Sequence, residues 1–119
     1  MGAITNHQAV AAICNGEPFR NSGNSFRADY TRHTPSQGRM PDAAYRLLVD
    51  ASAHAAELGE PLYVVHSYAT PIAWGLEGDL LTVPDTRYSV TTSRHQSLTL
   101  GGVVGGAYVT TGERVPLAA

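Results

Sequence analysis

Hydrophobic side chains recur with helical spacing over one long stretch of the chain, from Pro41 to Leu58. Pro41 suits the first position of a helix, and Gly59 followed by Pro61 ends the pattern. Between them, apolar residues follow the i, i+3, i+4, i+7 spacing that gathers them on one face: Ala44, Leu47, Leu48, Ala51, Ala55 and Leu58. We therefore predict a long amphipathic helix over residues 41–58.

Alternation with a period of two replaces this spacing after Pro61. In a strand over 62–68, the pleat places Leu62, Val64, His66 and Tyr68 on one face and Tyr63, Val65 and Ser67 on the other. His66 and Ser67 then point to opposite faces, which excludes them as a base–nucleophile pair with each other. Shorter extended stretches follow, so we predict an antiparallel meander over 62–90, with strands near 72–76, 80–83 and 87–90.

The remaining segments have weaker patterns. Residues 4–15 predict a short helix, capped by Thr5 or Asn6, with Cys14 on its apolar face as a buried structural thiol. Residues 17–40 are irregular and basic, with a turn at 21–24 and a weak strand at 25–30. Residues 91–100 predict a cap followed by a short helix, and the Gly-rich tail 101–119 a hairpin around Gly105–Gly106.

Together these elements predict an α+β fold in one domain over residues 1–119. Its sheet is a small antiparallel β-meander of three to four strands, with the 41–58 helix packed on one face and the N-terminal helix nearby. A chain of 119 residues is long enough to bury one core.

Composition narrows the classes of function. The net charge of −2 argues against a protein that coats nucleic acid without specificity, because that affinity comes from neutralising phosphates. No apolar run approaches the ~20 residues that span a bilayer. A single cysteine, Cys14, fits a reducing compartment, so we expect a cytoplasmic protein. All eight basic residues are Arg, a bias typical of a GC-rich genome.

Two stretches are candidate contact surfaces for an anion. In the first, four arginines between Phe19 and Met40 interleave with Phe19, Phe26 and Tyr30: Arg20, Arg27, Arg32 and Arg39. Charge alternating with flat rings is typical of a groove for single-stranded nucleic acid. The alternative, which we favour for this segment, is a solvated loop whose aromatic side chains anchor it to the core.

The second candidate is the junction where the meander enters the predicted short helix. A helix N-terminus offers free N–H groups to an anion, and the junction adds hydroxyls, a guanidinium and an imidazole: Thr91, Thr92, Ser93, Arg94, His95 and Gln96. The alternative is an ordinary helix cap with exposed polar side chains.

Motifs for catalysis and cofactors are missing. The chain has no GxSxG, HExxH, GxxxxGK[ST] or GxGxxG, and its five histidines are without metal-ligand spacing, so we expect no cofactor and no metal. One catalytic arrangement stays open: His66 and His95, meeting across the sheet with a Ser or Thr, would form an acid–base site. We expect an enzyme less than a binding module.

Two ordered blocks resemble a known family. They are YVVHSYATPIAW at residues 63–74 and YSVTTSRHQ at residues 88–96. They are similar to small uncharacterised proteins of actinobacterial phages and their hosts, a domain of unknown function with the signatures Y-V-x-S-Y-G-T-x-I-A and Y-S-x-T-T-S-[RK]-H-Q. Ala69 replaces the signature's Gly, which argues against a positive φ at that turn. The resemblance implies a phage or prophage protein and no established activity.

The sequence thus favours a small non-enzymatic binding module. Nucleic acid is the first expected partner, contacted through the 91–96 junction and through Arg20, Arg27 and Arg32. A host bacterial protein is the second, contacted through exposed Tyr68, Trp74 and Tyr88. An enzyme using His66 and His95 is the third.

Overall fold

The structure is a computed structural model, and it describes residues 3–77, 81–84, 95, 99, 107–110 and 113–116. In these ranges the chain forms α1 (Asn6–Cys14), β1 (Phe19–Arg20), β2 (Phe26–Thr31), α2 (Asp42–Leu58), β3 (Leu62–Ser67), β4 (Thr70–Leu76), β5 (Ala107–Thr110) and β6 (Glu113–Pro116). The predicted α+β class is confirmed.

The main sheet has four antiparallel strands in the order β1-β2-β3-β4. The segment 17–40, expected to be largely irregular, contributes β1 and β2, and β2 confirms the weak strand predicted at 25–30. Of the strands in the described ranges, β3 and β4 belong to the predicted 62–90 meander, and the strand expected at 87–90 lies outside the described residues. The strand expected at 80–83 is reduced to a single bridge between Trp74 and Thr82. In the tail, β5 and β6 pair antiparallel, from Ala107 with Pro116 to Thr110 with Glu113, and the turn predicted at Gly105–Gly106 lies outside the described residues.

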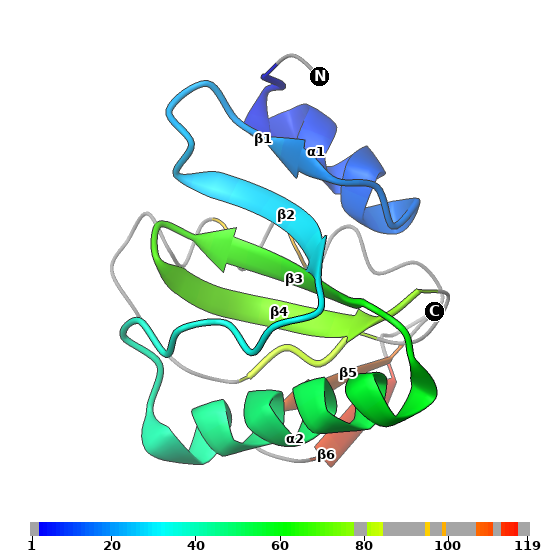
Figure 1. The fold of residues 1–119 in the computed structure, drawn as a ribbon. Helices are drawn as coiled ribbons and strands as arrows, with labels where there is room; N and C mark the ends of the chain where they lie inside the picture. The colour runs from blue at the N-terminus through cyan, green and yellow to red at the C-terminus, as the bar shows by residue number, and fades with distance from the viewer. Residues whose placement is uncertain are drawn as a thin grey trace.

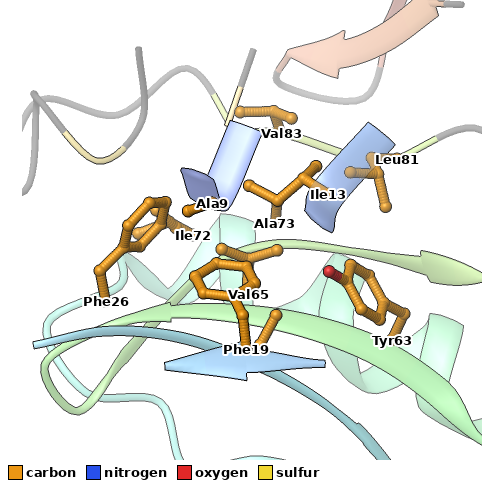
Figure 2. Packing of buried hydrophobic residues seen from close by; sticks show 11 residues of the cluster. Ala9, Ile13, Phe19, Phe26, Tyr63, Val65, Ile72, Ala73, Leu81 and Val83 are labelled. Carbon is orange, nitrogen blue, oxygen red and sulfur yellow. The ribbon is translucent and has the colours of Figure 1, made fainter. Parts of the chain in front are cut away.

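The two helices lie on opposite sides of the main sheet (Figure 1). On the α1 side, Ala9 and Ile13 pack on Phe19, Phe26 and other buried residues of the strands. Figure 2 shows the labelled side chains of this cluster gathered between the strands and α1, with Leu81 and Val83 closing its far side. Cys14, at the end of α1, is exposed, so the prediction that it is a buried thiol is wrong.

On the other side, α2 packs on Leu62, Val64 and Trp74 through a row of small and apolar residues that includes Ala44, Leu48 and Ala55. The observed helix begins one residue after the predicted start and ends at the predicted residue. Gly59 then takes a left-handed φ of 70°, and its N–H donates to the carbonyl of Ala56.

The alternation predicted for β3 is confirmed. Leu62 and Val64 belong to the α2 side of the sheet, and Tyr63 and Val65 to the α1 side. The turn to β4 contains a positive φ of 54°, contrary to expectation, and the residue that adopts it is Tyr68, one position before Ala69. A β-bulge between Val65 and His66 shifts the register with β4 just before this turn.

Candidate functional site

A groove of about 330 Å³ opens on the α2 side of the sheet, over β2 and the end of β3. The helix α2 packs on β3 and β4, so the face of β2 beyond it stays uncovered. The second wall is the loop that follows β2. The groove is lined by residues from three segments: Arg27, Asp29 and Thr31; His33, Thr34, Pro35 and Ser36; and Val64, His66 and Ala69.

Hydrogen bonds hold the loop wall in place. The hydroxyl of Thr31 accepts from the N–H of His33 at 3.1 Å, and the hydroxyl of Thr34 donates to that of Ser52 on α2 at 3.1 Å. The Tyr45 hydroxyl, also on α2, donates to the Pro35 carbonyl at 2.9 Å. The groove is therefore built between a sheet and a loop that is tied to a helix.

Farther along the same loop, Gly38 brings the chain close to the β3–β4 turn. Its φ is +59°, and a Cβ placed on it would lie 2.6 Å from the Thr70 hydroxyl oxygen and 2.7 Å from the Ala69 carbonyl oxygen. The N–H of Arg39 also donates to the Thr70 hydroxyl at 2.9 Å. Only glycine fits this approach, which closes the loop against the turn beside the groove.

Three basic or imidazole side chains share one row across the sheet at this end of the groove. The register pairs Arg20 with Arg27 and Arg27 with His66. Residues directly opposite in antiparallel strands have their Cβ atoms ~5 Å apart on the same face. Arg20, Arg27 and His66 therefore stand side by side, and we call them the basic row.

The basic row is electrostatically unfavourable as it stands. Like charges directly opposite each other destabilise a strand pair. In the part of the chain that the structure describes, the guanidinium of Arg27 has neither a hydrogen bond nor an ion pair with a carboxylate. Asp29, two positions along β2, lines the groove without pairing with it.

His66 adds a second unbalanced group to the row. Its Nδ1 is buried and has no hydrogen-bond partner. Burial, and then the charge of Arg27, lower the pKa of His66 from 6.5 to about 4. The imidazole is therefore neutral at neutral pH and offers hydrogen bonding without charge. The sequence predicted His95 as the possible partner of His66 and gave no sign that Arg27 is its neighbour.

His66 and His95 do not meet, so the expected acid–base site is not assembled. His95 lies on the α1 side, where its Nδ1 is 2.7 Å from the hydroxyl oxygen of Ser67 and its ring stacks on Phe26 with a centroid distance of 4.4 Å. Ser67 and His95 are each 1% exposed. A Ser–His contact exists, but it is closed off from solvent and belongs to the core.

The predicted 91–96 junction is only partly visible. Thr91, Thr92, Ser93, Arg94 and Gln96 lie outside the described residues, so the geometry of its amides stays untested. His95 is the one described member. Because it is buried, its side chain does not face an incoming anion in this conformation.

The arginines of the first candidate surface separate. Arg20 and Arg27 come together in the basic row. Arg32 turns away from it and donates from Nη1 to the Gly59 carbonyl at 3.0 Å, at the C-terminal end of α2. The rings that alternate with them do not face a ligand: Phe19 is 4% exposed and Phe26 0%. The favoured interpretation, aromatic side chains that anchor the segment to the core, is confirmed for both.

The aromatic residues expected to contact a host protein also differ from one another. Tyr68 is 55% exposed at the β3–β4 turn. Trp74 is 1% exposed beneath α2, so its expected role as a surface residue is wrong. Tyr88 lies outside the described residues.

Within the described ranges, no group of three or more His, Cys, Asp or Glu residues is arranged to hold a metal ion. The helices of the same ranges include none long and apolar enough to cross a membrane.

Comparison with known protein families gives a match over most of the chain. The sequence model of a family of unknown function (DUF8033) matches residues 4–113. No curated protein and no solved structure matches the chain.

Proposed function

This chain belongs to DUF8033, a family of unknown function, and from the groove we propose that it is a non-enzymatic module that binds single-stranded nucleic acid. The observation that carries the proposal is the basic row. Arg20, Arg27 and His66 present two guanidinium groups and a neutral imidazole side by side on three neighbouring strands, and two of them, Arg27 and His66, line the groove.

A phosphate would balance the charges of this row. Guanidinium groups bind phosphate through two parallel N–H donors, and two adjacent arginines double that capacity. Binding an anion would also remove the repulsion between Arg20 and Arg27 that the free protein carries. An arrangement that costs stability without a ligand is typical of a binding site.

The size of the groove and the charge of the chain favour a single strand over a duplex. A groove of about 330 Å³ accommodates a nucleotide and not a double helix. With two arginines in the row and a net charge of −2, we expect moderate affinity and a slope of log K against log salt of about −1.4, from roughly −0.7 per neutralised phosphate.

The test is fluorescence anisotropy with labelled single strands of about ten nucleotides, titrated with salt. Arg27→Ala is expected to weaken binding about tenfold or more and to make the salt slope shallower by about 0.7. Arg46→Ala is the matched control, because Arg46 is an exposed arginine on α2 and does not line the groove. Equal losses in the two variants would refute the proposal.

A second candidate, contact with a host bacterial protein, is favoured by one observation. Tyr68 is an exposed aromatic residue with a positive φ of 54°, a strained backbone for a bulky side chain. Aromatic side chains are enriched at the centres of protein interfaces. Retention of a host protein by the wild type, but not by Tyr68→Ala, supports this candidate. Retention by both variants counts against it.

The setting we propose follows from the two sequence blocks at 63–74 and 88–96: a phage or prophage protein that acts in the cytoplasm of a bacterial host. The use of Arg at all eight basic positions supports a GC-rich genome. Fractionation of a tagged chain expressed in an actinobacterium is expected to recover it with the cytoplasmic proteins. Recovery with the membrane fraction would contradict the proposed location.

A further inference from the structure

Building on the proposed nucleic-acid binding, we propose that the groove selects RNA over DNA, and that Asp29 makes the selection by accepting a hydrogen bond from the ribose 2′-hydroxyl. Failure of the proposed function would remove this inference with it. If only the preference for RNA fails, the proposed function stands, because the module would still bind single strands.

Asp29 shares the groove with the basic row. It lies two residues after Arg27 on β2, on the same face, and lines the same groove. Two residues of a strand cover about 6.7 Å. The groove therefore has a donor end, formed by the basic row, and an acceptor a short step away from it.

The acceptor is available to a ligand. Among the described residues, Asp29 has no hydrogen bond or ion pair with any basic side chain, and its side chain is exposed. A ligand that carries only phosphates would be repelled by this carboxylate. A ligand that carries a phosphate and, one sugar away, a hydrogen-bond donor would satisfy both ends of the groove.

A ribonucleotide unit has this combination. Its phosphate offers acceptors to the arginines, and its 2′-hydroxyl offers a donor to the carboxylate. The residue opposite Asp29 on β3 is Val64, an apolar residue of the groove lining that α2 largely covers, so no further polar group stands opposite Asp29 on β3. Because DNA lacks the hydroxyl, the carboxylate would be partly desolvated there without a donor.

The size of the selection follows from the bond that is lost. A hydrogen bond to a charged group corresponds to a roughly ten- to hundredfold change in affinity. We therefore expect the wild-type protein to bind a single-stranded RNA about ten- to hundredfold more tightly than DNA of the same sequence.

The experiment compares three labelled strands of one sequence, made of RNA, DNA and 2′-O-methyl RNA, with the wild-type protein and with Asp29→Ala. The 2′-O-methyl strand keeps the ribose ring and removes the donor, so it is expected to bind the wild type as weakly as DNA. Asp29→Ala is expected to weaken RNA binding and to strengthen DNA binding, because it removes an acceptor and a repulsive charge together. Asp50→Ala, an exposed acid on α2, is the matched control.

The outcomes separate the two proposals. If no strand binds the wild type, the proposed function fails. If RNA, DNA and 2′-O-methyl RNA bind equally, or if Asp29→Ala strengthens all three alike, the selection is refuted while nucleic-acid binding stands. Tight binding of the 2′-O-methyl strand would also refute it. That comparison uses the wild type alone, so it decides the question even if Asp29→Ala does not fold.

Discussion

Two adjacent residues of β3 have opposite surroundings. Ser67 faces α1, is 1% exposed, and is paired with His95 at 2.7 Å over the ring of Phe26. His66 faces the groove on the α2 side, beside Arg27, and its Nδ1 is buried without a partner. Ser67 and His66 are neighbours in the sequence, yet the hydroxyl of Ser67 has a close partner and Nδ1 of His66 has none.

The two faces of the sheet therefore differ in whether a buried polar group has a hydrogen-bond partner. Buried polar groups in native proteins are almost always hydrogen-bonded, because an unpaired group costs free energy. The Ser67–His95 contact follows this rule and stabilises the core. His66 departs from this rule opposite Arg27, and the ligand proposed above would complete the site.

The largest expected effect lies on the Ser67 side. Phe26 is 0% exposed, contacts Phe19 edge-on with a centroid distance of 5.0 Å, and supports the His95 ring. Phe26→Ala is expected to lower the free energy of unfolding by about 3–5 kcal/mol, measured by urea denaturation. Tyr68→Ala, at an exposed ring, is expected to change it by less than about 1 kcal/mol. Similar losses would contradict the packing described for this face.

A smaller loss is expected when the Ser67–His95 contact is broken. Ser67→Ala removes the hydroxyl and leaves a buried imidazole nitrogen with one partner fewer. We expect a decrease of about 1–3 kcal/mol in the free energy of unfolding. Ser22→Ala, in the exposed β1–β2 turn, is the control and should be nearly neutral. A neutral Ser67→Ala would show that the contact does not stabilise the fold.

The opposite sign is expected one residue earlier. His66→Leu removes a buried nitrogen without a partner, so the free energy of unfolding should rise by about 1 kcal/mol. The same variant should bind single strands less tightly, because the basic row loses its neutral hydrogen-bonding group. If His66→Leu is less stable and binds single strands as well as the wild type, His66 would support the fold and not the groove.

The dependence of stability on pH should also distinguish the wild type from His66→Leu. The pKa of His66 is about 4 in the folded protein and near 6.5 in the unfolded chain. The unfolded state therefore binds more protons between these values, and stability falls as the pH is lowered from about 6.5 to about 4. Urea denaturation at about pH 7 and about pH 5 should show a larger loss for the wild type than for His66→Leu. Equal losses would mean that His66 does not titrate in this window.

Much of the fold follows from local patterns. The spacing of apolar residues predicts α2 to within one residue of its start, and the alternation in β3 assigns each side chain to the correct face. The strand at 26–31 is weaker in the sequence, because Arg27 and Asp29 interrupt its apolar content, yet it forms the centre of the groove. Because charged residues on an uncovered strand face resemble a loop in sequence, the segment 17–40 was expected to be irregular apart from a weak strand at 25–30, which corresponds to β2.

The candidate site depends on contacts that no local pattern contains. Arg20, Arg27 and His66 were each visible as single residues, but their grouping depends on which strands pair and in which register. Asp29 and the hydroxyls of Thr34 and Ser36 carried no signal at all until the loop after β2 was placed beside the sheet. Trp74 was expected to be exposed and is buried, because the sequence around a single tryptophan does not indicate whether a helix will cover it.

The amino-acid sequence by itself determined the two helices, the faces of β3 and the α+β class, because periodicity is a property of residues close together in the chain. Only the tertiary structure decided that β2 pairs with β3 across the 17-residue helix α2, and that this helix covers Val64 and Trp74 while leaving Arg27 open. Strand register is set by long-range pairing and side-chain packing, so the row that gives the groove its charge exists only after the chain has folded.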